Sequence, residues 1–480
     1  MATENTNIPV RPAGGSFMSQ LPVGVSVMIL AAITGVFAGV GAWILKASIS
    51  WASDNILRIV QGTHLIWLVI MLPMCGILLA VCYQHYVVHE ELEHGTDQLR
   101  LALSEHRYQL RAGLCYQPLL ASILTLGFGG SAGAEGPIAY AGAAIGSNVS
   151  RLFRMGPGIQ LVMVGCGAGA GIAGIFKAPV AGAMFAMEVM KVKVNTLTVM
   201  ALMLASICGG VTCYALTGFT FDVQFLPHSF FDPRTLGWVS LLGIFCGIYS
   251  VYYNRLTAIL HRFFGSIPNR WLRAAAGGGI LAAAILVFPC LYGEGYGTMT
   301  QLINGDTGSF AEGGILSRLH MDSATIILLG TLVLLVKVFA TIATNSSGGV
   351  AGDFAPTVFA GSFAGLVFAE CVNAAFDANL SVGLFCLFGA AGAFAGIIHA
   401  PLMAIFLVSE IVGNGYGYIL PLTVCSFISY TVVKILTPKS KYAQSDHDDI
   451  ATLVATPSLE EVENKDATDK TSQGGEVNIH

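Results

Sequence analysis

The chain has 480 residues, of which 54% are apolar and only 11% are charged, and its mean hydropathy is +0.70. Soluble domains carry about twice this charged fraction, so the composition excludes an ordinary soluble enzyme and disfavours nucleic acid as a partner. The net charge of −5 resides in the tail from Lys439 onward, where nine acidic residues accompany four lysines, and it says nothing about the sign of a transported ion. We expect an all-α polytopic membrane protein, an integral multi-pass protein of a bacterial plasma membrane.

The first half of the chain alternates spanning and short apolar segments. Residues 1–20 are polar, lack the features of a cleaved signal peptide, and form an N-terminal segment. A transmembrane domain is expected over 21–437, in two repeats at about 21–217 and 236–437. Its first half begins with two apolar runs long enough to span, 21–49 and 66–88. Three short Gly/Ala-rich segments, typical of broken, re-entrant helices, follow at 113–130, 138–149 and 157–175. A further span is expected at 196–217.

The second half repeats this style. Two spans flank a basic connection at 255–273, which the positive-inside bias places in the cytoplasm. A looser loop is expected over 293–322. Further apolar segments then follow at 323–343, 356–375, 381–397, 400–412 and 418–436. The acidic tail, 438–480, is low in aromatic residues, and we expect it to be disordered.

The eleven cysteines are scattered, mostly inside apolar runs. They form no CxxC motif and no Cys/His pair at metal-binding spacing, so the sequence predicts neither a disulfide framework nor a zinc site. We expect buried cysteines that act as small apolar residues. No metal and no cofactor is therefore predicted.

A glycine-rich break, Gly133-Ala134-Glu135-Gly136-Pro137, places a single carboxylate between two apolar runs. Hydrocarbon tolerates such a break only where protein buries it or where it lines a cavity. An ionisable residue within a membrane is by default a candidate functional residue. We therefore expect Glu135 to gate an ion path, although a glutamate that merely caps its own helix is the structural alternative.

An internal repeat supports this interpretation. Pro137 and Pro356 are each followed by a glycine at +5, and Pro179 and Pro401 are each followed by a glutamate at +9. Repeated halves with interrupted helices are typical of transporters whose site lies at the repeat interface. Because proline is favoured in the first turn of a helix, each break predicts a helix start inside the membrane. Converging helix N-termini offer backbone N–H donors and a partial positive charge, which favour an anion.

These motifs resemble those of the CLC family of chloride channels, voltage-gated members included, and proton-coupled chloride exchangers. Residues 133–137 look like the family's GxEGP gating motif, and Gly352-Asp353-Phe354-Ala355-Pro356 looks like its second anion motif. The resemblance covers roughly residues 25–442. It implies the CLC-type inverted-repeat fold, cytoplasmic termini, a membrane-embedded homodimer with one pore per subunit, and chloride or another small anion as the transported ion, with protons as a further candidate.

The resemblance assigns roles to particular residues. Glu135 matches the gating glutamate, with Gly133 and Gly136 beside it as anion-binding backbone. The amides of Asp353 and Phe354 match the central anion site, and we expect the Asp353 side chain to face away from the ion. Tyr442 matches a tyrosine whose hydroxyl contacts the ion, but its polar neighbours fit a surface residue equally well.

Three departures from the family pattern bear on function. His94 stands where the family has an ion-contacting serine; it could donate an N–H to the anion or simply be an interfacial histidine. Ala134 replaces a common arginine before the gate. Val189 replaces the internal glutamate of many exchangers, although some exchangers lack it and pass protons by water. The neighbouring Glu188 and its counterpart Glu410 are expected to be structural, bonding the amides of neighbouring helices.

Three functions remain open at this point. The leading one is CLC-type anion transport with a channel-like conductance gated by Glu135, because Val189 removes the usual proton relay. The alternative is an anion/proton antiporter of the same fold. A cation-coupled secondary transporter of an organic substrate, with Glu135, Glu188 and Glu410 as ligands, is disfavoured because helix N-termini present positive partial charge. The apolar regions contain no nucleophile–base pair, so an enzyme is not expected.

Overall fold

A computed structural model describes residues 21–62, 67–90, 92, 109–219, 231–312, 314–318, 320–412 and 415–437. Within these residues the chain is helical, apart from connecting segments, which include an isolated bridge between Gly133 and Gly352. Nine of the described helices are long and apolar enough to cross a membrane. The predicted N-terminal segment and acidic tail lie outside the described residues.

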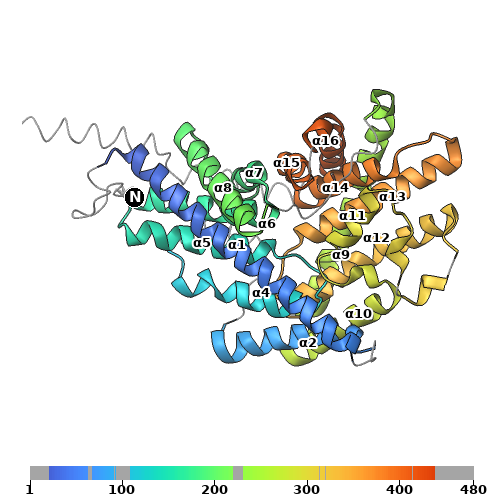
Figure 1. Cartoon of the computed structure of the whole chain (residues 1–480), viewed down its shortest axis with the longest axis horizontal. Coiled ribbons are helices and arrows are strands. Elements are labelled where there is room, and N and C mark those ends of the chain that lie inside the picture. Colours follow the sequence, from blue (N-terminus) through green and yellow to red (C-terminus); the bar gives the residue numbers. More distant parts are fainter. Residues whose placement is uncertain are drawn as a thin grey trace, which may run out of the picture.

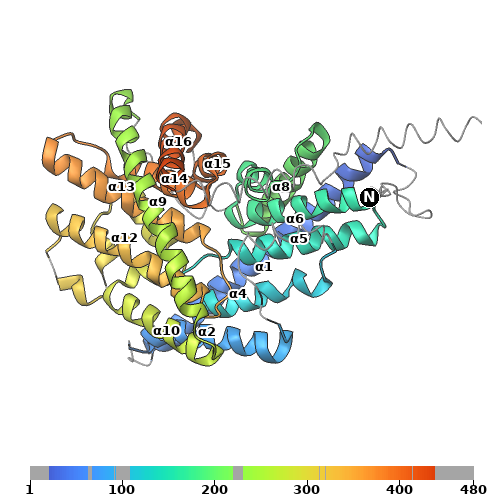
Figure 2. The same ribbon diagram turned by 180° about the vertical axis from the view of Figure 1, so that it is seen from behind.

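The helices fall into two groups that face each other across the middle of the molecule (Figures 1 and 2). The first group comprises α1 (Val23–Gly62), α4 (Gln117–Gly127), α5 (Glu135–Leu152), α6 (Pro157–Phe176), α7 (Pro179–Met184) and α8 (Thr196–Leu216). The second comprises α9 (Leu236–Gly265), α11 (Tyr296–Ile303), α12 (Ser323–Asn345), α13 (Phe354–Phe376), α14 (Val382–Ile398), α15 (Pro401–Ile411) and α16 (Ile419–Leu436). Below them α2 (Trp67–Tyr83) packs against α10 (Arg270–Val287).

The two groups repeat one packing pattern. In the first, α5 packs on α6, and α6 packs on α8 and α1; in the second, α13 packs on α14, and α14 packs on α16 and α9. The groups meet where α7 packs on α15 and where α5 approaches α13. The fold is thus the expected inverted repeat with broken, re-entrant helices. Its breaks come together at the junction of the two halves.

Glycine explains how closely the equivalent helices approach. A Cβ on Gly142 of α5 would lie 2.2 Å from the carbonyl oxygen of Gly167 on α6. In the second half, a Cβ on Gly361 of α13 would lie 2.4 Å from the carbonyl oxygen of Gly389 on α14. Both distances are too short for any side chain, so backbones touch at both crossings, as is common where helices pack in lipid. The glycine at +5 of each repeat motif is therefore a packing residue.

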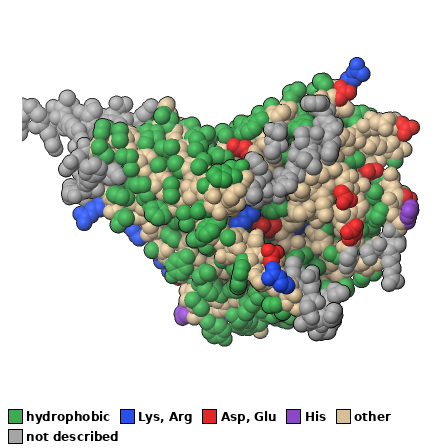
Figure 3. Space-filling view, in the orientation of Figure 1, with side chains coloured by type: hydrophobic (Ala, Val, Ile, Leu, Met, Phe, Trp, Pro, Cys, Tyr) green, Lys and Arg blue, Asp and Glu red, His purple; other side chains and the backbone are tan. Residues whose placement is uncertain are grey.

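The outer surface is apolar. Hydrophobic side chains cover much of the face in Figure 3, and large ones such as Phe37, Ile248 and Leu328 are more than half exposed. Such exposure would be unfavourable in water but matches hydrocarbon. The nine candidate spans and this apolar surface describe an integral, multi-pass membrane protein.

One sequence expectation about a loop was wrong. The stretch 293–322 contains α11 and three-residue to four-residue 3-10 turns rather than a loose loop. Its helix forms because Met299, Leu302 and Ile303 are spaced to share one face, and all three are buried. The many glycines and charges of the stretch concealed this short amphipathic segment.

Candidate functional site

Glu135 lies at the first turn of α5 and is 2% exposed. Its side chain reaches across the junction to the N-terminus of α13. There Oε1 accepts hydrogen bonds from the backbone N–H of Phe354 and, at 2.9 Å, from that of Ala355. A carboxylate oxygen therefore occupies the two donors that the N-terminus of α13 presents to the centre of the protein.

The two helix breaks are joined by their backbones. Gly133 N–H donates to the Gly352 carbonyl at 2.9 Å, and Gly352 N–H donates to the Gly133 carbonyl at 2.6 Å. A Cβ on Gly133 would lie 2.0 Å from Glu135 Oε2, and one on Gly136 would lie 3.2 Å from the Gly352 Cα. Glycine here leaves room for the carboxylate. The N–H of Gly133, predicted to bind the anion, is used by Gly352 in this conformation.

Asp353 immediately precedes α13, and its side chain contacts the end of α12. Its Oδ1 accepts a hydrogen bond from Asn345 Nδ2 at 2.6 Å. The sequence paired the amides of Asp353 and Phe354 as the anion donors, whereas the structure shows Phe354 and Ala355 donating to the carboxylate. The donor pair is one residue further along because Oε1 lies over the first turn of α13.

A second pair of carboxylates forms a reciprocal arrangement at the junction. Glu188, in the π-helical turn η4 (Phe185–Val189) that continues α7, accepts from the amides of Leu402 and Met403 at the start of α15, at 3.2 and 2.7 Å. Glu410, near the end of α15, accepts from the amides of Val180 and Ala181 at the start of α7, at 3.1 and 2.9 Å. Each helix thus carries the cap of the other, which is the geometry expected of structural carboxylates.

Val189 is buried next to Glu188 and offers no proton-carrying group. The carboxylate of Glu188 is held by two amides of α15, whereas that of Glu135 is held by two amides of α13. The position that the family resemblance associates with an internal glutamate is therefore apolar here.

Two charged residues near Glu135 were missed by sequence reasoning. Lys337 of α12 is fully buried; its Nζ donates to Ser131 Oγ at 2.9 Å and lies 4.6 Å from the centre of the Phe359 ring. Glu294, in the loop before α11, accepts from the N–H of Ala134 at 3.1 Å. Both lie close enough to Glu135 to interact with its charge. The available signals were a lysine inside an apolar span and a glutamate between two glycines.

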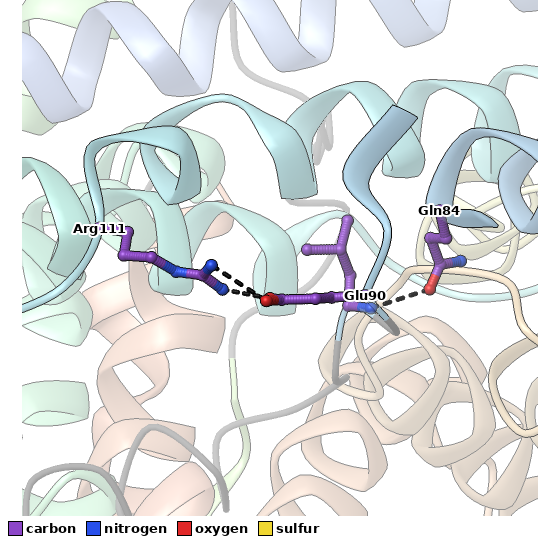
Figure 4. A network of polar contacts seen from close by, with 4 residues as sticks. Gln84, Glu90 and Arg111 are labelled. Atoms are coloured by element: carbon purple, nitrogen blue, oxygen red, sulfur yellow. Dashed lines mark hydrogen bonds and ion pairs between the residues drawn. The ribbon is translucent and has the colours of Figure 1, made fainter. Parts of the chain in front are cut away.

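The two remaining predicted site residues, His94 and Tyr442, lie outside the described residues. The described chain before His94 is anchored to the segment that precedes α13. Gln84 accepts from Leu92 N–H at 2.9 Å and donates to the Gly348 carbonyl at 2.8 Å, and Glu90 pairs with Arg111 (Figure 4). The Arg111 guanidinium lowers the pKa of the exposed Glu90 carboxyl.

No group of three or more potential metal ligands gathers among the described residues. The described cysteines form no disulfide and are distributed over several helices. The chemistry of the site is therefore that of backbone donors, two carboxylates and one ammonium group.

Comparison with known proteins places the chain among anion transporters. Residues 75–434 match the model of the family described as voltage gated chloride channel. The H(+)/Cl(-) exchange transporter ClcA of Vibrio cholerae is 26% identical over 448 residues, covering 90% of this chain and 91% of the relative. A putative chloride channel protein, ClcB-like, of Ralstonia nicotianae is 27% identical over 392 residues, covering 79% of this chain and 85% of the relative.

Solved structures agree with this fold. A slow cyanobacterial Cl−/H+ antiporter superposes with a TM-score of 0.73 at 22% identity, covering 88% of this chain and 98% of the other. A CLC-type fluoride/proton antiporter superposes with a TM-score of 0.70 at 21% identity, covering 88% and 97%.

Proposed function

Because the chain belongs to the voltage-gated chloride channel family, we propose that it moves chloride across a membrane in exchange for protons, with Glu135 as the residue that both ions use. The observation that carries this proposal is the carboxylate of Glu135 on the amides of Phe354 and Ala355. Those donors suit any small anion, so a chloride ion and the carboxylate compete for one place.

Competition of this kind links the two ions. An ionised Glu135 holds the donors of α13 and excludes chloride. Protonation removes its negative charge, weakens its bonds to the two amides, and leaves the donors to an anion. Because the site is buried, the charge difference between the two protonation states is poorly screened. One side chain thereby makes proton uptake and anion binding interdependent.

Of the two candidate functions, exchange is now better supported than a channel-like conductance. The channel-like interpretation rested on Val189 at the position of the internal glutamate. Against it, the relatives that span nine-tenths of the chain are named as exchange transporters. An exchanger without that glutamate needs another carrier to bring protons to Glu135, and water is the simplest.

Flux into proteoliposomes tests the proposal. Purified protein is reconstituted with a chloride gradient and no proton gradient, and internal pH is recorded together with chloride. Exchange predicts that chloride moving down its gradient drives protons uphill, and that the proton movement disappears in Glu135→Gln. Glu312→Gln, which alters an exposed carboxylate, is the matched control. Chloride flux without any proton movement in the unmodified protein would establish a channel instead.

A further inference from the structure

Four helix N-termini at the junction of the two halves are capped by carboxylates from elsewhere in the chain. Glu188 and Glu410 cap α15 and α7 symmetrically, and Glu135 caps α13. The two-fold relation of the repeats would place the fourth carboxylate at the position equivalent to Glu135, two residues before Pro356. That residue is Phe354, which has no carboxylate, so it cannot cap α5 as Glu135 caps α13.

Glu294 fills this vacant role from a position other than the repeat-equivalent one. Its Oε1 accepts from the N–H of Ala134, the residue that precedes α5, at 3.1 Å. Of the four capping carboxylates, Glu294 is the one that lies on a loop, which connects η6 (Pro289–Leu291) to α11. Like Glu188 and Glu410, and unlike Glu135, it remains partly exposed.

The backbone around Glu294 is firmly placed. Gly293 and Gly295 both have positive φ, 71° and 87°, so the loop takes a conformation that favours glycine on both sides of the glutamate. Gly293 N–H donates to the Gly129 carbonyl at 3.2 Å, and a Cβ on Gly295 would lie 2.5 Å from the Phe359 ring. The loop thus holds the carboxylate at the start of α5.

The charges around Glu294 make its ionisation matter to an anion. Its charge interacts with those of Glu135 and Lys337, so this region contains two carboxylates and one buried ammonium group. When ionised, Glu294 adds a second negative charge near Glu135, which opposes the entry of an anion. The titratable and charged groups on the surrounding elements are Glu135 on α5, Lys337 on α12, Tyr296 on α11 with Lys46 of α1 above its ring, and Tyr292 and Cys290 in the preceding segment.

We propose that Glu294 is a second carboxylate of the anion pathway, which holds the donor at the start of α5 and sets, through its own protonation, how tightly an anion binds beside Glu135. It is a positioning residue rather than the gate, because it touches Ala134 and acts on the anion through its charge. This inference rests on the proposed function, since it requires an anion beside the amides of α13.

Chloride binding, measured by titration calorimetry on the purified full-length protein in detergent with sodium chloride, tests this role without any need for transport. The background variant is Glu135→Gln, which removes the gate's own titration. In that background we expect chloride to bind on the order of tenfold more tightly at pH 4.5 than at pH 7.5. In Glu135→Gln/Glu294→Gln the affinity should be high and equal at both pH values.

Two further variants make the outcome decisive. Glu294→Asp in the same background keeps the charge and should restore the pH dependence, while Glu312→Gln should leave it unchanged. Equal affinities at the two pH values in Glu135→Gln alone would overturn the inference even if the Glu294 variants failed to fold. A pH dependence that persists in the double variant would also overturn it. Absence of chloride binding in both the unmodified protein and Glu135→Gln would instead overturn the proposed function, and this inference with it.

Discussion

The two pairs of carboxylates at the junction use the same chemistry in opposite ways. Glu188 and Glu410 are related by the repeat, and each caps the helix that carries the other. Glu135 caps α13, but its counterpart Phe354 has no carboxylate with which to cap α5. The loop residue Glu294 caps α5 instead. Reciprocal caps tie α7 and α15 together, because moving either helix breaks both. The unreciprocated cap leaves Glu135 as a side chain that can depart without loosening a second helix.

The difference also separates these carboxylates from ordinary helix caps. Some helices that begin outside the junction are capped by the residue just before them: Asn195 accepts from Thr198 N–H at the start of α8, and Asp322 accepts from Thr325 N–H at the start of α12. At the junction, α5, α7, α13 and α15 have no side-chain cap of their own. Their donors are left to groups that come from a distance, and an anion is one such group.

The largest effect is expected from the unreciprocated carboxylate. Glu135→Gln should reduce proton movement in proteoliposomes by at least about 100-fold, since the variant cannot ionise, and should leave chloride flux measurable. The dependence of chloride flux on pH should largely vanish as well. Proton transport that survives at near the original rate would mean that the proton is carried elsewhere.

Helix packing at the two equivalent crossings gives the next effect. Gly142→Ala and Gly361→Ala each force a Cβ against a backbone carbonyl, so each should destabilise the protein by about 1–3 kcal/mol, seen as a lower melting temperature in detergent. Gly279→Ala on α10, where a Cβ meets nothing within 4 Å, is the control and should be neutral or slightly stabilising. Similar losses at 142 and 361 are expected if the two halves pack alike.

The reciprocal caps should show a stability effect without a coupling effect. Glu188→Gln or Glu410→Gln weakens two charge-assisted bonds to a helix N-terminus, at a cost of about 1–2 kcal/mol. Protein that still folds should exchange protons and chloride in the original ratio. A changed ratio in either variant would show that the symmetric pair takes part in transport.

The smallest effect is expected at the exposed pair of Glu90 and Arg111. Glu90→Gln should change the melting temperature at neutral pH hardly at all, since exposed ion pairs contribute little. Arg111 lowers the pKa of Glu90 in the folded protein, so the pair's contribution is present above the unfolded carboxyl pKa of about 4.3 and is lost as pH falls through the lower folded value. A melting curve recorded at several pH values in both proteins checks this; a large shift at neutral pH would contradict it.

Much of the fold could be predicted because its signals are local. Apolar runs, the Gly-x-x-x-Pro breaks and the matched +5 and +9 spacings describe segments and their order. Glu135 was singled out the same way, since it stands out as a carboxylate in an apolar break. The second hydrogen-bond donor could not be predicted from the local sequence, because whether the amide of Asp353 or that of Ala355 joins that of Phe354 depends on how two distant helices meet.

The missed residues teach the same lesson. Glu294 lies 160 positions from Ala134 and contacts it only because the loop before α11 folds over the start of α5. Lys337 appeared as one polar position in an apolar span, and its nearness to Glu135 is a property of the packed protein. Asp353 was expected to turn its side chain from the ion, and its partner, Asn345, became visible only in three dimensions.

The central claim is that the carboxylate of Glu135 stands in the place of an anion. It is tested most directly by a crystal structure of Glu135→Gln grown with bromide and measured for anomalous scattering. We expect a bromide peak at the amides of Phe354 and Ala355, where Oε1 lies in the unmodified protein. Bromide elsewhere in the protein, with those two amides still bonded to the substituted side chain, would contradict the claim.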